Sequence, residues 1–210
     1  MNNEKRDFDK LAASWDEKPA RVKLAEDVAR AVAGQVVLTP GMDVLDFGCG
    51  TGLLTVQLHP FVRSVTGVDS SQGMLDMFRK KIAALNLNNV NALYADLEKG
   101  DTLAGRYDLV VSNMTLHHIK EIKPLFEQFH RITAPAGHLC IADLDPDNGK
   151  FHDDNTGVFH FGFDRESLRD IFLETGFNDV RDTDAAQVVK PGIDGEMGRF
   201  TVFLMTGRRS

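Results

Sequence analysis

Three closely spaced glycines are the densest chemical signal in this 210-residue chain, in the segment Asp46-Phe47-Gly48-Cys49-Gly50-Thr51-Gly52. The apolar run 44–47 leads into them, and a segment with helical periodicity, Leu53 to His59, follows. Glycines at a strand-to-helix turn permit a sharp bend and let a ligand approach where a Cβ would clash. A dinucleotide fingerprint, G-x-G-x-x-G, would need a glycine at position 53, where this chain has leucine. The motif predicts a ligand-binding turn that departs from the dinucleotide pattern.

Two more carboxylates follow strand-like segments. Asp69 ends the segment from Ser64, 17 residues after Gly52, and Asp96 closely follows the segment from Val90 to Tyr94. A carboxylate at a strand end beside a glycine loop can accept both hydroxyls of a ribose, and Asp96 could accept from an adenine amino group. Taken singly, Asp69 could be a helix N-cap and Asp96 a turn residue. Because parallel strands end at one edge of a sheet, the three features together favour a nucleoside-binding site.

The elements that must position these residues alternate between strand-like and helix-like segments from about residue 40 onward. Units of this kind predict a parallel sheet with helices on both faces. The predicted strands are 44–47, 64–68, 90–94, 107–112 and 139–142; the predicted helices are 53–59, 71–85 and 125–132. After a helix over 165–175, the strand-like segments from 180 onward and over 200–205 are joined without a helix, so they must pair antiparallel. The first forty residues predict two helices.

Composition and charge narrow the class of protein. Hydrophobic residues make up 42% and charged residues 26% of the chain, as in globular proteins. The net charge is −7, which disfavours binding to nucleic acid or to an anionic membrane through bulk charge. The two cysteines, Cys49 and Cys140, are far apart and fit a reducing compartment. Since no apolar run approaches the ~20 residues of a membrane span, we expect a soluble, cytoplasmic protein.

These motifs, in this order, resemble the class I S-adenosylmethionine-dependent methyltransferases, especially those that act on small molecules. The resemblance runs from about Phe8 to Arg208. Beyond the glycine loop, it is carried by Gly67-Val68-Asp69-Ser70-Ser71, Ala95-Asp96, Tyr107 to Asn113, Leu116-His117-His118-Ile119 and Pro135-Ala136-Gly137-His138-Leu139. The chain has Ala136 where the family often has a second glycine, at a turn remote from the ligand.

The resemblance implies an α/β fold: a Rossmann-like, seven-stranded, mostly parallel sheet with helices on both faces and its last strand antiparallel. We expect residues 1–210 to form a single domain. It would comprise an N-terminal helical cap over 1–40, a cofactor-binding core over 41–145, and a lid with a C-terminal hairpin over 146–210.

The implied cofactor is S-adenosylmethionine. Its methionine part would lie over the loop Gly48-Cys49-Gly50-Thr51-Gly52, with Asp46 beneath the loop. The remaining implied contacts are Asp69 to the ribose, Ser70 and Met74 near the adenine, Asp96 to its amino group, Leu97 to the ring through its backbone, and the Asn113 carbonyl to the methionine amine. Trp15 and Arg21 would cover the cofactor, with Arg21 meeting its carboxylate, and His118 would pack over it.

Methyl transfer from a sulfonium needs alignment of nucleophile, methyl and sulfur, and it needs a general base only for a protonated acceptor. Candidate bases are His117, His118 and His160. His160 lies in the aromatic segment Phe159-His160-Phe161-Gly162-Phe163, where the family builds its substrate lid. In an extended segment, the three phenylalanines would point one way and His160 the other. We expect residues 151–163 and the region of Trp15 to close over an apolar substrate pocket, unless this segment only completes the core.

Several alternatives remain from the sequence. The acidic segment 143–149 begins like a calcium loop, but its glycine is one place late and Pro146 stiffens it; we expect a solvated loop and no metal site. A nicotinamide-dependent oxidoreductase and a non-catalytic S-adenosylmethionine-binding protein are the competing functions. Nucleic acid is disfavoured as a substrate, because Asn113-Met114-Thr115-Leu116 stands where the family's base-flipping enzymes often carry Asn/Asp-Pro-Pro-aromatic. The expected partner is a small molecule; the sequence does not indicate an oligomeric state.

Overall fold

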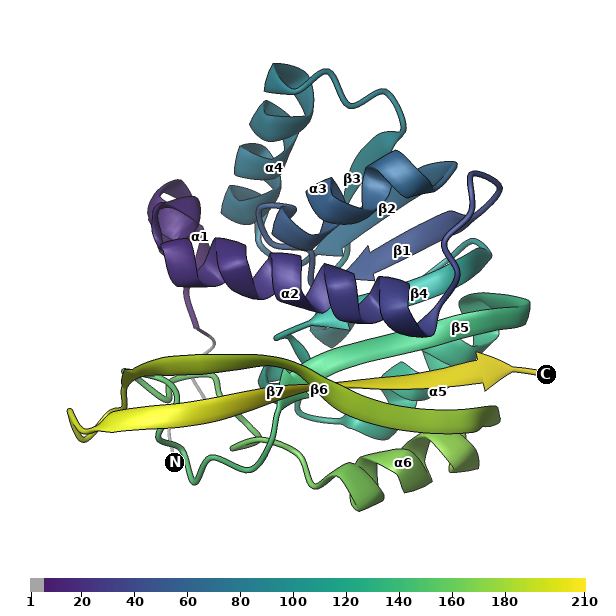
Figure 1. Ribbon diagram of the computed structural model, residues 1–210. Coiled ribbons are helices and arrows are strands. Elements are labelled where there is room, and N and C mark those ends of the chain that lie inside the picture. Colours follow the sequence, from purple (N-terminus) through teal and green to yellow (C-terminus); the bar gives the residue numbers. More distant parts are fainter. Residues whose placement is uncertain (1–5) are drawn as a thin grey trace.

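The computed structural model describes residues 6–210 and contains one seven-stranded sheet (Figure 1). The strands are β1 (Asp43–Phe47), β2 (Ser64–Asp69), β3 (Val90–Tyr94), β4 (Tyr107–Asn113), β5 (Thr133–Leu144), β6 (Phe177–Pro191) and β7 (Met197–Arg209), in the order β3-β2-β1-β4-β5-β7-β6. Strand β7 runs antiparallel to both of its neighbours, and the other neighbouring pairs are parallel. The predicted Rossmann-like architecture with its last strand antiparallel is confirmed.

Helices cover both faces of the sheet because successive strand residues point to opposite sides. Val44 packs with α2 (Pro19–Gln35), α3 (Leu53–Leu58) and α4 (Gln72–Ala84) in one hydrophobic cluster. Its neighbour Leu45 packs with α5 (Ile122–Ile132) and α6 (Arg165–Glu174) in a second cluster on the other face. The short apolar segments of β1 and β4 are therefore buried on both sides, as a parallel sheet requires.

Some boundaries differ from the sequence prediction. Strand β5 begins at Thr133, well before the predicted Leu139, and its pairing with β4 shifts register between Tyr107 and Leu109. Ala136, predicted to lie in a turn that ends the preceding helix, has a φ of +62° within this irregular part of the strand. A bulge lets the chain bend while the ladder continues on either side.

The N-terminal region contains three helical segments instead of the predicted two: α1 (Phe8–Leu11), a 3₁₀ helix η1 (Ala12–Glu17) and α2. The predicted helix from Leu53 ends at Leu58, and a 3₁₀ turn η2 (His59–Phe61) accommodates Pro60. Strands β6 and β7 are longer than the apolar pattern indicated, and they form the hairpin that crosses the lower part of Figure 1.

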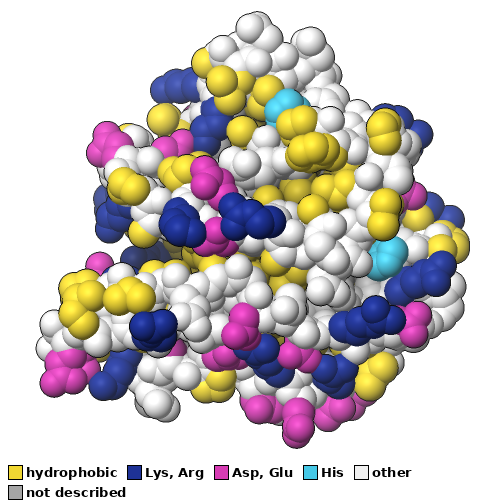
Figure 2. Space-filling view, in the orientation of Figure 1, with side chains coloured by type: hydrophobic (Ala, Val, Ile, Leu, Met, Phe, Trp, Pro, Cys, Tyr) yellow, Lys and Arg dark blue, Asp and Glu magenta, His cyan; other side chains and the backbone are white. Residues whose placement is uncertain are grey.

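The charge distribution on the surface and the apolar character of the helices bear on whether nucleic acid or a membrane could be a partner. On the face shown in Figure 2, Lys and Arg side chains are interspersed with Asp and Glu side chains and do not gather in a patch of one sign. Within residues 6–210, no helix combines the length and the apolar character that crossing a bilayer requires.

Candidate active site

A cavity of about 600 Å³ opens at the carboxyl ends of β1, β2, β3 and β4. Its walls come from the glycine loop, from α2 and the segment before it, and from residues 151–159 after β5. The distal end of β6 contributes Val188, Lys190 and Pro191. In an open parallel sheet this edge is where ligands bind, because the loops that follow the strands converge there.

The three loop glycines have different roles, although all have positive φ. A Cβ on Gly48 would lie 2.3 Å from the Thr115 side chain, and one on Gly52 would lie 2.1 Å from the Phe78 ring. A Cβ on Gly50 would meet nothing nearer than the Met74 sulfur at 4.0 Å, and Gly50 lines the cavity. Close packing thus requires glycine at 48 and 52, whereas Gly50 leaves space that a ligand can fill.

Asp69 links the glycine loop to the end of β2. One carboxylate oxygen accepts a hydrogen bond from the Gly50 N–H and the other from the Ser71 N–H, each at 2.8 Å. A carboxylate oxygen has two lone pairs and can accept from more than one donor. The side chain is therefore held in one orientation at the cavity wall, where the sequence predicted it.

Asp96 lies at the same edge, at the N-terminus of the 3₁₀ turn η3 (Leu97–Lys99). Its carboxylate accepts a hydrogen bond from the Glu98 N–H at 3.2 Å and is 3.2 Å from the Lys99 ammonium. Asp96 is thus the turn residue that the sequence offered as an alternative, and this N-cap contact fixes its carboxylate at the cavity lining.

Asp46 lies beneath the loop and is only 1% exposed. Its carboxylate accepts a hydrogen bond from the Thr55 hydroxyl at 2.6 Å. Burial raises the pKa of Asp46 to about 6, against the lowering effect of that hydrogen bond and with a smaller contribution from the nearby Asp69 charge. Burial likewise raises the pKa of the neighbouring Cys49 thiol well above its usual value, so Cys49 is an inert part of the wall.

The N-terminal segment forms one side of the cavity. The Arg21 guanidinium stacks 3.6 Å from the Trp15 ring centroid and donates a hydrogen bond to the Trp15 carbonyl at 3.1 Å. Asp9 accepts hydrogen bonds from the Ser71 hydroxyl at 2.5 Å and from the Gly73 N–H at 2.8 Å. Thr51 of the glycine loop donates to Asp16 at 2.6 Å. The cap is therefore attached to both the loop and α4.

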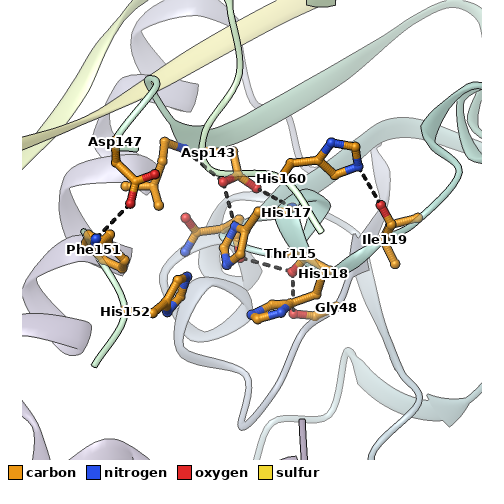
Figure 3. A network of polar contacts seen from close by, with 12 residues as sticks. Gly48, Thr115, His117, His118, Ile119, Asp143, Asp147, Phe151, His152 and His160 are labelled. Atoms are coloured by element: carbon orange, nitrogen blue, oxygen red, sulfur yellow. Dashed lines mark hydrogen bonds and ion pairs between the residues drawn. The ribbon is translucent and has the colours of Figure 1, made fainter. Parts of the chain in front are cut away.

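Three histidines line the far end of the cavity and are turned toward one another (Figure 3). His117 and His118 lie on the 3₁₀ turn η4 (Leu116–His118), and His152 lies in the segment after β5. The ring centroids are 4.2 Å apart for His117 and His118, and 4.9 Å apart for His117 and His152. Burial, with a smaller contribution from the neighbouring His117, lowers the pKa of His118 to about 3 and that of His152 to about 2.

His160 does not line the cavity. Its Nε2 donates a hydrogen bond to the Ile119 carbonyl at 2.9 Å (Figure 3), and its ring packs on Phe163. The expectation that Phe159, Phe161 and Phe163 point one way is wrong, because this segment bends and is not a strand. Phe159 lines the cavity, Phe161 is 48% exposed and Phe163 is buried in the core. His160 therefore links residues 159–163 to the Ile119 backbone.

The acidic segment 143–149, which begins in the last residues of β5, is not a solvated loop, which corrects the sequence expectation. Asp143 is buried and hydrogen-bonds to His117 Nδ1 at 2.7 Å. Asp147 is buried and accepts from the Phe151 N–H at 2.7 Å. Asp145 pairs with Arg165 at 2.7 Å. These carboxylates fix the path of the chain toward His152.

Of the residues predicted to bind cofactor, the structure places one group around the cavity: Asp46, Gly48, Cys49, Gly50, Asp69, Ser70, Met74, Asp96, Leu97, Asn113, His118, Trp15 and Arg21. The remaining one, Gly52, packs against Phe78 just outside. Sequence reasoning missed Asp9, Asp16 and the placement of His152. Asp9 and Asp16 had no signal beyond their polarity in a helical segment; His152 had only its proximity to the aromatic segment.

The comparisons with known proteins agree with this geometry. Residues 44–137, which run from β1 into β5, match a family described as a methyltransferase domain. An uncharacterized methyltransferase of Schizosaccharomyces pombe is 31% identical over 162 residues, which are 70% of this chain and 57% of that protein. Over the part that carries the glycine loop and the strand ends of the cavity, the chain is thus similar to methyltransferases. The nicotinamide-dependent alternative therefore lacks support.

Solved structures of methyltransferases share the fold of this chain. A putative methyltransferase of Haloferax volcanii, in complex with the Trm112 methyltransferase activator, has a TM-score of 0.75, with 18% identity and coverage of 97% of this chain and 98% of that one. Phosphoethanolamine N-methyltransferase 2 of Haemonchus contortus, in complex with S-adenosylmethionine, has a TM-score of 0.69, with 18% identity and coverage of 86% of this chain and 52% of that one. The chain spans little more than half the length of the first curated relatives it matches, from 51% to 60%.

Proposed function

We propose that the cavity binds S-adenosylmethionine and that this chain transfers its methyl group to a small-molecule acceptor. The observation that carries the proposal is the pairing of Gly50 with Asp69. A glycine with open space above it stands beside a carboxylate that its own N–H holds in place at 2.8 Å. This pair offers both a surface for the amino-acid part of the cofactor and acceptors for its ribose.

The other groups along the cavity favour one orientation of the cofactor. Asp96 and Leu97 stand at the adenine end and Arg21 stands on the cap, where a guanidinium suits the cofactor carboxylate. Asn113 ends β4, and its side-chain oxygen is buried with no hydrogen-bond partner within residues 6–210. A ligand amine beside Asn113 would satisfy this oxygen. The sulfonium methyl would then face the three histidines.

A small acceptor fits the remaining space. A cavity of about 600 Å³ lies within the usual range of about 300–1,000 Å³ for small-ligand pockets, and the cofactor would occupy much of it. The cap, residues 151–159 and the end of β6 surround its mouth. Charges of both signs are interspersed on the face shown in Figure 2, so nothing there favours a polyanionic substrate. A structural neighbour is itself named for phosphoethanolamine, a small amine.

The chemistry asked of the protein is mainly positioning. A sulfonium carries an activated methyl, so holding nucleophile, carbon and sulfur in line supplies much of the rate. His118, with a pKa of about 3, is a weak base in its buried position. Proton removal by an isolated imidazole there would be inefficient, which favours an acceptor that is already deprotonated or is made acidic by another group.

Calorimetry with S-adenosylhomocysteine tests the cofactor part of the proposal. We expect micromolar affinity, about −8 kcal/mol. Gly50→Val should abolish binding because the new side chain fills the ligand's space, whereas Gly34→Ala, at an α2 position with nothing within 4 Å of its Cβ, should leave affinity unchanged. Equal affinities for both variants and the unaltered chain would place the ligand elsewhere.

The acceptor part needs a turnover assay. Release of S-adenosylhomocysteine is measured with pools of small alcohols, thiols and amines, and in parallel with DNA, RNA and protein. We expect turnover with members of the small-molecule pools. Methylation confined to a macromolecule would overturn the small-molecule proposal and leave the cofactor site intact.

A further inference from the structure

The three histidines at the acceptor end of the cavity are arranged as ligands of one ion. His117, His118 and His152 each offer an imidazole nitrogen, and these atoms all lie within 4.8 Å of one another. A three-histidine zinc site has Zn–N distances of about 2.0–2.1 Å, so its nitrogens are separated by about 3.3 Å. Small rotations of the rings about their side-chain bonds would bring these atoms to that separation.

The hydrogen bonds behind two of the three rings have the pattern of a metal site. His117 Nδ1 is 2.7 Å from a carboxylate oxygen of Asp143, and His118 Nδ1 is 2.7 Å from the Gly157 carbonyl. A carbonyl accepts only, so His118 carries its proton on Nδ1 and presents a lone pair at Nε2. An acceptor behind each ligating imidazole fixes its tautomer and orientation in this way.

The inner nitrogens lack partners. Nε2 of His117 and Nε2 of His152 are buried with no hydrogen bond within residues 6–210. Leaving two such atoms unsatisfied is costly, and simple ring packing does not satisfy them. An ion between the rings would. The Arg6 guanidinium, 3.3 Å from His152 Nδ1, would have to release that nitrogen so that it could carry the proton, and it has a second acceptor in the Asp154 carbonyl at 3.3 Å.

We propose that His117, His118 and His152 bind one divalent transition-metal ion, with Asp143 as the residue that positions His117. Three neutral imidazoles suit zinc, iron(II), cobalt(II) or nickel(II) and not magnesium or calcium, which prefer oxygen ligands. The sequence analysis expected no metal site, because it weighed only the acidic segment 143–149 as a calcium loop. The structure brings His152, which follows β5, to His117 and His118, which follow β4.

The remaining position on the ion would face the cavity and take the acceptor atom of the substrate. This part rests on the proposed function. A metal lowers the pKa of a bound hydroxyl or thiol, and the proton leaves to solvent. The oxygen or sulfur lone pair then forms the bond to the methyl carbon, and the carbon–sulfonium bond breaks with its electrons kept by the cofactor sulfur. An ion here would replace the efficient base that buried histidines do not provide.

The test is direct metal binding to the full purified chain after chelation and dialysis. Zinc is titrated by calorimetry, and cobalt(II) is followed by its d–d absorption. We expect one equivalent to bind, with an absorption typical of four- or five-coordinate nitrogen ligation. His152→Ala should weaken binding at least 100-fold, and Asp143→Asn about 10–100-fold. His160→Ala, next to the cluster but bonded to Ile119, should bind as the unaltered chain does.

Two outcomes would overturn the site: no saturable binding of either ion, or equal binding by the unaltered chain and His152→Ala. Circular dichroism checks that each variant is folded. S-adenosylhomocysteine is titrated separately into metal-free protein. If the chain binds S-adenosylhomocysteine but no metal, the metal site is overturned and the proposed function stands. If the chain binds metal but no S-adenosylhomocysteine, the proposed function is overturned and the metal site stands.

Discussion

The carboxylate of Asp69, at the end of β2, accepts a hydrogen bond at 2.8 Å from the backbone N–H of Gly50, in the loop that follows β1. One side chain thus ties together the two neighbouring strand ends from which the cavity is built. The same carboxylate would hold the ribose, so the cofactor contact and the shape of the loop depend on each other.

The first prediction follows from this contact. Asp69→Ala should weaken S-adenosylhomocysteine binding by about 1.5–3 kcal/mol, since it removes an acceptor and also frees the Gly50 N–H. Asp69→Asn keeps one acceptor and should lose less. The control is Asp76→Asn on α4, whose exposed carboxylate pairs with Arg79 outside the cavity. Calorimetry on the three variants ranks the effects; an unchanged affinity for Asp69→Ala would remove this residue from the site.

The second prediction concerns pH and Asp46. Its pKa is raised from 3.8 to about 6 in the fold, so the folded state holds this proton more tightly than the unfolded state does. The unfolding free energy contributed by Asp46 therefore falls as pH rises from about 4 to about 6, by up to roughly 3 kcal/mol. Asp46→Asn removes this pH-dependent contribution, because an amide does not ionise in this range, and the amide oxygen can still accept a hydrogen bond from Thr55.

Urea unfolding of the unaltered chain and of Asp46→Asn at pH 4, 5, 6 and 7 measures the effect. Other carboxylates contribute equally to both proteins, so the difference between the two is what matters. We expect it to move in favour of the variant as pH rises. A difference that stays constant across this range would mean that the carboxyl ionises normally inside the protein.

The third prediction concerns the attachment of the cap. Asp9→Ala removes the acceptor for the Ser71 hydroxyl and the Gly73 N–H, and it should cost about 1–3 kcal/mol of stability. Amide exchange in residues 8–17 should accelerate, and S-adenosylhomocysteine should bind several-fold more weakly because Trp15 and Arg21 lose their fixed position. Asp7→Ala is the matched control, because the Asp7 side chain caps only α1 and its loss leaves the contacts of Asp9 in place. Comparable effects from both variants would indicate that helix capping, and not attachment to α4, holds the cap.

The fourth prediction concerns closure over the ligand. Residues 151–159 and the region of Trp15 should exchange their amide hydrogens more slowly when S-adenosylhomocysteine is bound, by a larger factor than β1 or β4. The segment around Phe161 and Phe163, which lies outside the cavity, should change less. Hydrogen exchange followed by mass spectrometry resolves these peptides. Identical exchange with and without ligand would show that the walls are fixed.

The amino-acid sequence by itself determined the alternation of strands and helices and the sheet edge at which the site lies. Val44 and Leu45 belong to a short run of apolar residues that must be buried on both faces, and this burial places Asp46, the glycine loop and the carboxylates of later strands at one edge. These features depend on local periodicity and on the rules of parallel pairing, so they can be predicted without coordinates.

Only the tertiary structure decided which side chains of the irregular segments between helices and strands face the cavity. His152 is 34 residues from His118 in the sequence, in a stretch without helix or strand periodicity, and its position depends on Asp147 and on the path of the chain around β5. The alternation of Phe159, Phe161 and Phe163 was misleading for the same reason, because an irregular segment takes its side-chain directions from distant contacts. Asp9 meets Ser71 only after the cap has packed on α4. Contacts between segments far apart in the chain have no local signal.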